Sequence, residues 1–346
     1  MPSVLQSISF VLVATACHEC LADGAYPLRV GSAVITPHAE IVEAGQEAAI
    51  LDLKLLVTGE GARCIVNDPF FGAVGRSFAA IRLTVPGTQS VRFLDLEPIC
   101  DPFSGGSQFS QALGPVAVRQ GQVVGRRINM KSFGGNGTAV DCTVQVVLYD
   151  GIAVDRSGGK TPERVVRPTT TDMVAVSHPV TWNVDPTSRI HCSKLADHNG
   201  PRTDVTVNYT GTRVETGLLS FQFCFINNSN QCQQVFDPMF QYKDLAWEPP
   251  RTVRILHWNT ALERFEQVSR PYFVGKSLPV TSSMYWQLPP DGILGCEVDT
   301  EPYHGAGKYA VELEMLSNFW RNSEQDGGPL DPQQLPAKRR QEFTLE

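Results

Sequence analysis

The sequence predicts an all-β protein built from two antiparallel β-sandwich domains, immunoglobulin-like or jelly-roll in type, with little helix. Short segments in which apolar and polar residues alternate recur from about residue 30 onward, and Gly, Pro and Asn separate them. This pattern is typical of antiparallel sandwiches. No segment sustains the 3.6-residue apolar period of an amphipathic helix. A chain of 346 residues is also long for one core, which favours two domains.

Alternating segments give the expected strands in chain order. They lie at residues 49–57, 80–85, 91–96, 142–149, 203–209, 219–225 and 309–315. Pro86-Gly87 directly follows the second of them and is a strong turn signal.

Composition shifts divide the chain near its middle. Residues 156–163 hold two Gly, one Pro and no apolar residue, so they are the expected linker. The first domain is therefore predicted at residues 25–155 and the second at 164–320. Hydrophobicity falls again after that point, and residues 321–346 are expected to form a flexible tail.

The N-terminus carries a secretion signal. Residues 8–16 are apolar but too short to span a bilayer, which takes about 20 residues, and small residues follow them up to Ala22. This pattern predicts a signal peptide at residues 1–22 and a secreted, extracellular protein that begins near Asp23. Two alternatives are a lipoprotein acylated at Cys17 and a buried N-terminal strand or helix. No later segment is apolar enough to cross a membrane.

Cysteine usage fits an oxidising compartment, where disulfides form. Cleavage after residue 22 leaves seven cysteines, so at least one is unpaired or pairs between chains. Cys224 and Cys232 flank a turn-forming cluster at 227–230, which predicts a bridge across a hairpin. By elimination we expect two further bridges, Cys192–Cys296 and Cys64 with Cys142 or Cys100.

Three Asn-x-Ser/Thr sequons permit N-glycosylation of a secreted chain, at Asn136, Asn208 and Asn227.

Charge and motif content exclude several function classes. Acidic residues number 36 and basic residues 29, so no basic excess favours nucleic acid or an anionic membrane. The histidines have no metal-site spacing, and neither a phosphate-binding glycine loop nor a nucleophile elbow occurs. We therefore expect no metal and no cofactor.

One short segment carries the spacing of a catalytic site. Glu297, Asp299 and Glu301 would share one face of a strand, because alternate residues of a strand project to the same side. The spacing resembles the E-x-D-x-E strand of laminarinase-like jelly-roll glycoside hydrolases. That resemblance implies a nucleophile at Glu297, a modulating Asp299 and a general acid at Glu301. The alternative is a solvated acidic strand face.

Aromatic residues are unevenly distributed. All five Trp lie after residue 163, whereas the first half uses Phe. Trp and Tyr suit sugar stacking and protein interfaces, although large cores also use Trp. We expect ligand binding mainly by the second domain, through aromatics that include Trp247, Trp258, Tyr285 or Trp286.

These observations favour a secreted binding, structural or adhesion protein whose ligand is an extracellular glycan or protein. A secreted glycoside hydrolase that uses the acidic strand is the first alternative. A self-assembling subunit of a surface structure is the second, because it fits the odd cysteine and the β-rich composition.

Overall fold

A computed structural model describes sixteen stretches of the chain: residues 24–59, 63–66, 79–88, 90–96, 116–155, 173–193, 195, 203–213, 218–228, 233–236, 253–269, 285–288, 290–299, 305–314, 320–322 and 338–345. The described residues form antiparallel β-sheets and no helix, which confirms the predicted all-β class. They accordingly include no helix with the length and apolarity that a membrane span requires. The predicted signal peptide and linker lie outside the described residues.

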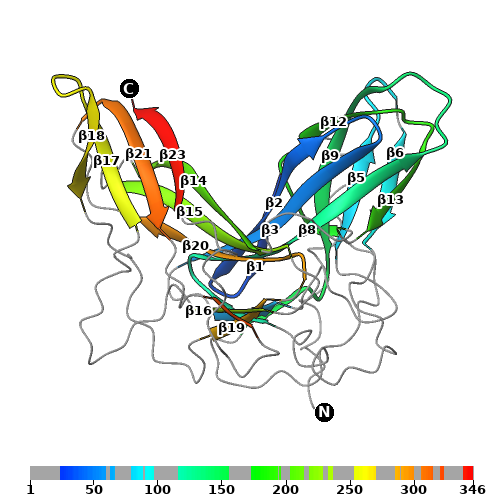
Figure 1. The fold of residues 1–346 in the computed structure, drawn as a ribbon. Coiled ribbons are helices and arrows are strands. Elements are labelled where there is room, and N and C mark those ends of the chain that lie inside the picture. Colours follow the sequence, from blue (N-terminus) through cyan, green and yellow to red (C-terminus); the bar gives the residue numbers. More distant parts are fainter. Residues whose placement is uncertain are drawn as a thin grey trace, which may run out of the picture.

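One long sheet runs through the whole molecule and bends into a V (Figure 1). Its strands follow the order β1 (Leu28–Val30), β2 (Ala33–Ala44), β3 (Ala48–Thr58), β8 (Gln122–Phe133), β20 (Gly292–Asp299), β15 (Leu218–Asn227) and β14 (Thr203–Arg213). A further strand, β13 (Arg189–Ser193), pairs with β8 beyond the end of β20.

A second sheet accompanies the long sheet in each arm of the V. In the first arm its order is β11 (Met173–Val176), β9 (Val140–Tyr149), β5 (Ala79–Thr84) and β6 (Val91–Asp95), and β12 (Val180–Val184) also pairs with β9. In the second arm the order is β18 (Arg264–Ser269), β17 (Val253–Asn259), β21 (Gly307–Glu314) and β23 (Lys338–Leu345).

Two small sheets lie near the base of the V (Figure 1). One contains β10 (Ala153–Asp155), β4 (Arg63–Val66) and β7 (Val116–Arg119), and the other contains β19 (Tyr285–Leu288), β16 (Gln233–Phe236) and β22 (Trp320–Asn322).

The strand pairing crosses the predicted domain boundary. Strands β11, β12 and β13 follow the predicted linker in sequence, but they pair with β9 and β8 of the first half. Conversely, β20 of the second half pairs with β8 through register pairs such as Gly125↔Ile293. The two halves therefore share one long sheet in addition to the smaller sheets that accompany it.

The segment expected as a flexible tail contributes two strands. Trp320–Asn322 pairs with β16, and Lys338–Leu345 pairs with β21 over eight register positions. Alternating side chains explain the second case, because Phe343 packs inward while its charged neighbours face outward.

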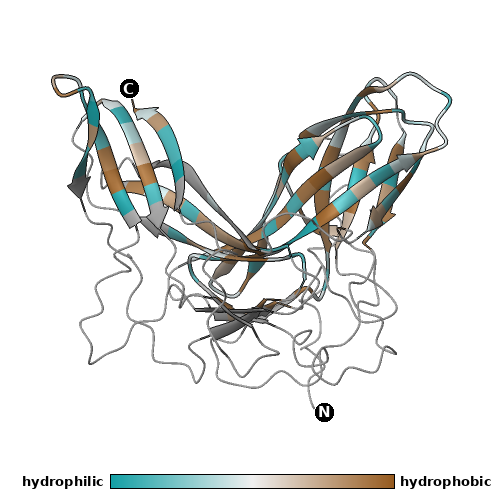
Figure 2. Cartoon of the chain, in the orientation of Figure 1, coloured by the Kyte–Doolittle hydropathy of each residue, from teal (hydrophilic) through white to brown (hydrophobic). Residues whose placement is uncertain are grey.

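The first arm encloses an apolar core that its two sheets share. Leu51, Leu53 and Leu55 alternate along β3 and are fully buried in one cluster with Ile81 and Leu83 of β5. Hydrophobic and hydrophilic segments alternate along the strands of both arms (Figure 2). This arrangement is what a period of two residues produces when one face of a sheet is buried.

Trp182 changes the interpretation of the aromatic distribution. It lies on β12, is fully buried in the core of the first arm, and donates a hydrogen bond from Nε1 to the Gly45 carbonyl at 2.8 Å. Trp182 therefore serves the core of the first arm although it lies after residue 163, so its place in the sequence does not by itself indicate ligand binding.

Glycines permit the close approach of strands where the long sheet passes between the arms. A Cβ on Gly125 of β8 would lie 2.0 Å from the Leu53 carbonyl oxygen, and one on Gly295 of β20 would lie 2.0 Å from the Phe223 carbonyl oxygen. Because these obstacles are backbone atoms, no side chain fits at either position without moving a strand.

Candidate functional site

The sheet β18-β17-β21-β23 of the second arm presents two chemically different faces. Its register places Tyr309 opposite both His257 and Phe343, so these three side chains share one face. Trp258 and Lys308 are the next residues along β17 and β21, and they project to the other side. We call that other side the outer aromatic face and define it by Trp258, Phe265, Lys308, Arg340 and Glu342.

The inner face is held by stacked rings. Tyr309 is fully buried, and its ring centroid lies 4.7 Å from His257 and 5.7 Å from Phe343. Phe343 in turn contacts Phe221 of β15 edge-on at 5.6 Å, which joins this sheet to the long sheet. The Tyr309 hydroxyl donates a hydrogen bond to the Gly305 carbonyl at 2.7 Å. These contacts fix the sheet and thereby the orientation of its outer face.

Two aromatic rings and two cations make up most of the outer aromatic face. Trp258 and Phe265 are half-buried and lie edge to face, with centroids 5.0 Å apart. The Lys308 ammonium lies 5.6 Å from the Trp258 ring and 5.4 Å from the Phe265 ring, and the Arg340 guanidinium lies 4.2 Å from Phe265. Such cation–π contacts hold long basic side chains against the sheet.

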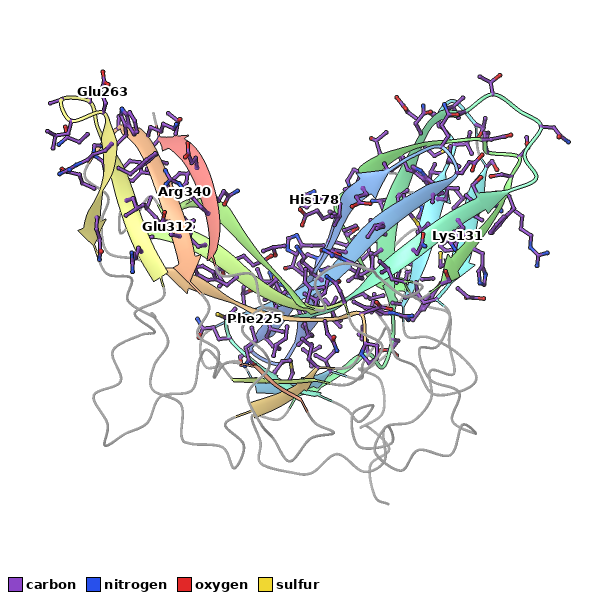
Figure 3. All side chains as sticks on the ribbon, viewed as in Figure 1. Lys131, His178, Phe225, Glu263, Glu312 and Arg340 are labelled. Atoms are coloured by element: carbon purple, nitrogen blue, oxygen red, sulfur yellow. The ribbon has the colours of Figure 1, made fainter. Side chains whose placement is uncertain are left out.

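Carboxylates neutralise both cations. Glu342 accepts from Lys308 at 2.6 Å and from Arg340 at 2.9 Å, and Glu312 pairs with Arg340 at 3.3 Å. Figure 3 labels Glu312 and Arg340 on the adjacent strands β21 and β23. The hydrogen bond from Lys308 lowers the pKa of Glu342 below its usual value. The outer aromatic face is therefore aromatic, and its two cations are paired with carboxylates.

The other predicted ligand aromatics lie elsewhere in the fold. Tyr285 and Trp286 are neighbours on β19, and their register partners are Phe236 and Val235 of β16. The fold thus separates both residues from Trp258, and Trp247 lies outside the described residues.

Two residues of the acidic segment lie on a described strand. Glu297 and Asp299 occupy alternate positions of β20, opposite Gln222 and Ser220 of β15. Glu301 lies outside the described residues. Among the residues that the structure describes, no three His, Cys, Asp or Glu side chains gather as a metal site requires.

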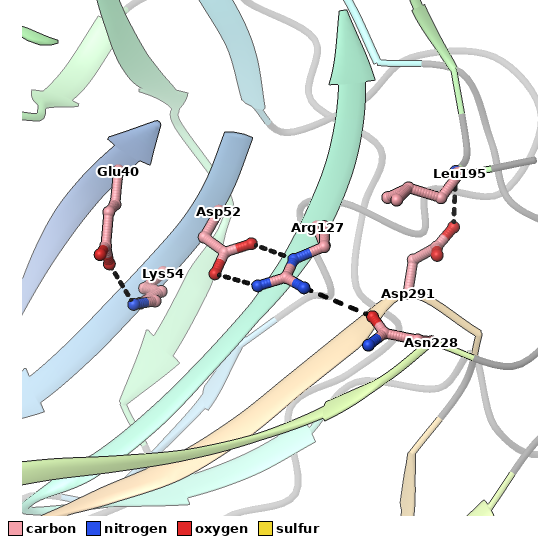
Figure 4. Close-up of polar contacts among 7 residues, drawn as sticks. All are labelled: Glu40, Asp52, Lys54, Arg127, Leu195, Asn228 and Asp291. Carbon is pink, nitrogen blue, oxygen red and sulfur yellow. Dashed lines mark hydrogen bonds and ion pairs between the residues drawn. The ribbon is translucent and has the colours of Figure 1, made fainter. Parts of the chain in front are cut away.

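A buried ionic network joins the arms at the base of the V (Figure 4). Arg127 of β8 binds Asp52 of β3 through two hydrogen bonds, of 2.7 and 3.0 Å, and both side chains are at most 7% exposed. Arg127 also reaches Asn228, which follows β15, at 3.5 Å. Asp291 accepts from the Leu195 amide at 3.1 Å, and its carbonyl accepts from the Arg127 amide. We call these five residues the junction network.

A histidine lies beside the junction network on the same long sheet. His38 of β2 lies opposite Lys54 of β3, and Lys54 pairs with Glu40 at 2.6 Å. The His38 Nε2 atom is buried and makes no hydrogen bond among the described residues. Burial lowers the pKa of His38, and the nearby charges of Lys54 and His178 lower it further.

No disulfide forms among the described residues. Cys142, Cys192 and Cys224 are buried thiols, which excludes the expected Cys64–Cys142, Cys192–Cys296 and Cys224–Cys232 bridges and leaves the Cys64–Cys100 alternative as a prediction. Burial raises the pKa of Cys192 to about 12 and that of Cys224 to about 11, so both stay protonated at neutral pH. Cys232 and Cys100 lie outside the described residues.

Strand register explains the failure of the Cys192–Cys296 pairing. Cys192 lies opposite Met130 of β8, and Cys296 lies opposite Gln122 of the same strand. Eight residues of extended strand span about 26 Å, whereas a bridge needs Cα atoms within about 7 Å. The sequence alone does not reveal the register of β13 and β20 on β8, so elimination among the cysteines could not exclude this pairing.

The sequons differ in their environments. Asn136 is exposed in the loop between β8 and β9. Asn227 is fully buried, and its Nδ2 atom donates to the Leu288 carbonyl at 2.9 Å, so a glycan there would require the fold to open. Asn208 lies on β14.

Sequence reasoning selected Trp258 but missed its partners. Lys308, Arg340 and Glu342 lie 50 to 84 residues later in the chain and reach Trp258 only through the pairing of β17 with β21 and of β21 with β23. Alternation within 338–345 was the one signal that could have found the last two. No known family model matches the chain, and no curated protein sequence matches it significantly.

Proposed function

We propose that the protein is a secreted binding or adhesion protein that takes an extracellular glycan or protein on its outer aromatic face. The observation that carries the proposal is the half-exposed Trp258–Phe265 pair, flanked by Lys308 and Arg340. Rings of this kind supply apolar contact area, and Trp and Arg are enriched among residues that dominate binding energy. The secretion signal at residues 1–22 supports an extracellular ligand.

Trp258→Ala tests this proposal. An anchoring tryptophan contributes at least about 2 kcal/mol, so we expect retention on an array of glycans and extracellular proteins to fall roughly 30-fold. Near-ultraviolet circular dichroism and thermal unfolding score folding separately. A folded Trp258→Ala chain that binds every arrayed ligand as the parent does would contradict the proposal.

Phe93→Ala is the matched control. Phe93 lies on β6 of the other arm and is 49% exposed, so it presents a ring to solvent without an adjacent tryptophan. We expect this variant to bind like the parent. An equal loss in both variants would point to nonspecific aromatic adhesion instead of a site.

The hydrolase alternative rests on Glu297 and Asp299, which occupy alternate positions of β20, and needs Glu301 as well. Hydrolysis of a β-glucan by the parent but not by Glu297→Gln would favour this alternative over the binding function.

A further inference from the structure

Strand β23 is joined to the rest of the protein by contacts that do not depend on the chain preceding it. Its backbone pairs with β21 from Gly307↔Leu345 to Glu314↔Lys338, and among the described strands it pairs with no other. It also lies against β14 of the long sheet. It therefore closes the second arm from one edge.

The side-chain contacts of β23 with other strands likewise do not depend on the chain that precedes it. Phe343 stacks on Tyr309 and contacts Phe221, and Arg340 lies on Phe265 while it pairs with Glu312. Every one of these partners belongs to β15, β18 or β21. A β23 strand from a second copy of this chain would find the same partners and make the same contacts.

The sequence between β22 and β23 is long enough for either arrangement. Fifteen residues, 323–337, separate Asn322 from Lys338. A chain of that length spans at most about 50 Å when extended. A β21 strand of a second copy within that distance of Asn322 could therefore pair with β23.

We infer that β23 is an exchangeable strand through which copies of this protein link to one another. Exchange of an identical element needs no new contacts, so the choice between the two arrangements depends on concentration. A short tether holds its strand at an effective concentration of about 1 mM, so exchange becomes extensive when copies are crowded to that level. Reciprocal exchange gives closed dimers, and one-way exchange gives open chains. This inference does not rest on the proposed ligand.

A mixed disulfide between two full-length chains tests the inference. Lys308 and Thr344 are directly opposed across β21 and β23, and both are exposed. Opposed residues of antiparallel strands have Cα atoms about 4.5–5.5 Å apart, which suits a disulfide. Lys308→Cys on one tagged chain and Thr344→Cys on a differently tagged chain are mixed at about 1 mM and oxidised. We expect a covalent pair carrying both tags, with the 308–344 link found by peptide mapping.

Two controls make the result decisive. Lys308→Cys/Thr344→Cys in one chain must close its own bridge, which shows that the geometry permits the bond. Gln341→Cys, opposite Val311 on the other face of β21, must not link to Lys308→Cys.

Phe343→Ala should accelerate exchange, because it removes the ring that anchors β23. Failure of the mixed pair to form while the double variant closes its bridge would overturn the inference, and so would equal linkage of Gln341→Cys. Ligand binding enters neither readout.

Discussion

The two arms of the V pack their sheets together with different kinds of side chain. The first arm buries a continuous set of aliphatic side chains between its two sheets, together with Trp182. In the second arm, the described contacts between β15 and the outer sheet run through the rings of Phe221, Phe343 and Tyr309. Aliphatic cores depend on area and close packing, whereas ring contacts also depend on orientation. The described packing of the second arm therefore depends more on ring orientation than that of the first arm.

A single sheet connects the two arms. We expect substitutions in the junction network to weaken this connection most. Arg127→Met leaves the Asp52 carboxylate buried without its partner, so we expect a loss of about 3–5 kcal/mol in the free energy of unfolding. Urea unfolding followed by two probes, one fluorescent label on each arm, measures the effect. Both arms should be destabilised together.

The control for this change removes both charges. Asp52→Leu/Arg127→Met replaces a buried ion pair with apolar side chains, which is often neutral or stabilising. A loss in Arg127→Met below about 1 kcal/mol, of the size measured for exposed pairs, would show that the pair does not hold the arms together.

Gly125→Ala tests the bend itself. The new methyl group would overlap with the Leu53 carbonyl oxygen, and overpacking of this kind costs about 1–3 kcal/mol. Gly45→Ala is the matched control, because a Cβ there meets only the Ala48 carbonyl oxygen at 3.6 Å. Equal stability of the two variants in thermal unfolding would contradict the assignment of Gly125 as a required glycine.

Tyr309→Phe acts on the second arm alone. It keeps the ring stack and removes the hydrogen bond to the Gly305 carbonyl, so we expect a loss of about 1 kcal/mol. Hydrogen exchange should report the loss in β17, β21 and β23. Faster hydrogen exchange in β5 and β9 as well would show that the substitution destabilises the first arm too, and would contradict the prediction.

The smallest expected effect is a pH dependence of stability that arises from His38 in the first arm. The pKa of His38 is lower in the folded protein than in the unfolded chain, so unfolding is accompanied by proton uptake in acid. Stability should therefore fall as pH drops below the unfolded value of about 6.5, and level off below the folded pKa. Urea midpoints from pH 8 to 5 should be flatter in His38→Gln. An unchanged slope would contradict the assignment.

Sequence reasoning recovered the strands because alternation is a local property. The segment expected at 49–57 became β3 at Ala48–Thr58, and that expected at 142–149 became β9 at Val140–Tyr149. Pairing is not local, so the sequence did not reveal that β8 accepts β20 from the other half. The same limit explains why the Cys192–Cys296 assignment failed and why Trp258 was found without Lys308.

The shared sheet also sets an order of events during synthesis. Gly125 pairs with Ile293, so 293 − 125 = 168 further residues must be made before that edge of β8 meets β20. At roughly 5–20 residues per second, the ribosome needs roughly 8–34 seconds to make them. Over that interval β8 has an edge without its β20 partner, and unpaired edges are templates for aggregation. The nascent chain is thus most exposed to aggregation through this edge of β8 until β20, which ends at Asp299, has emerged.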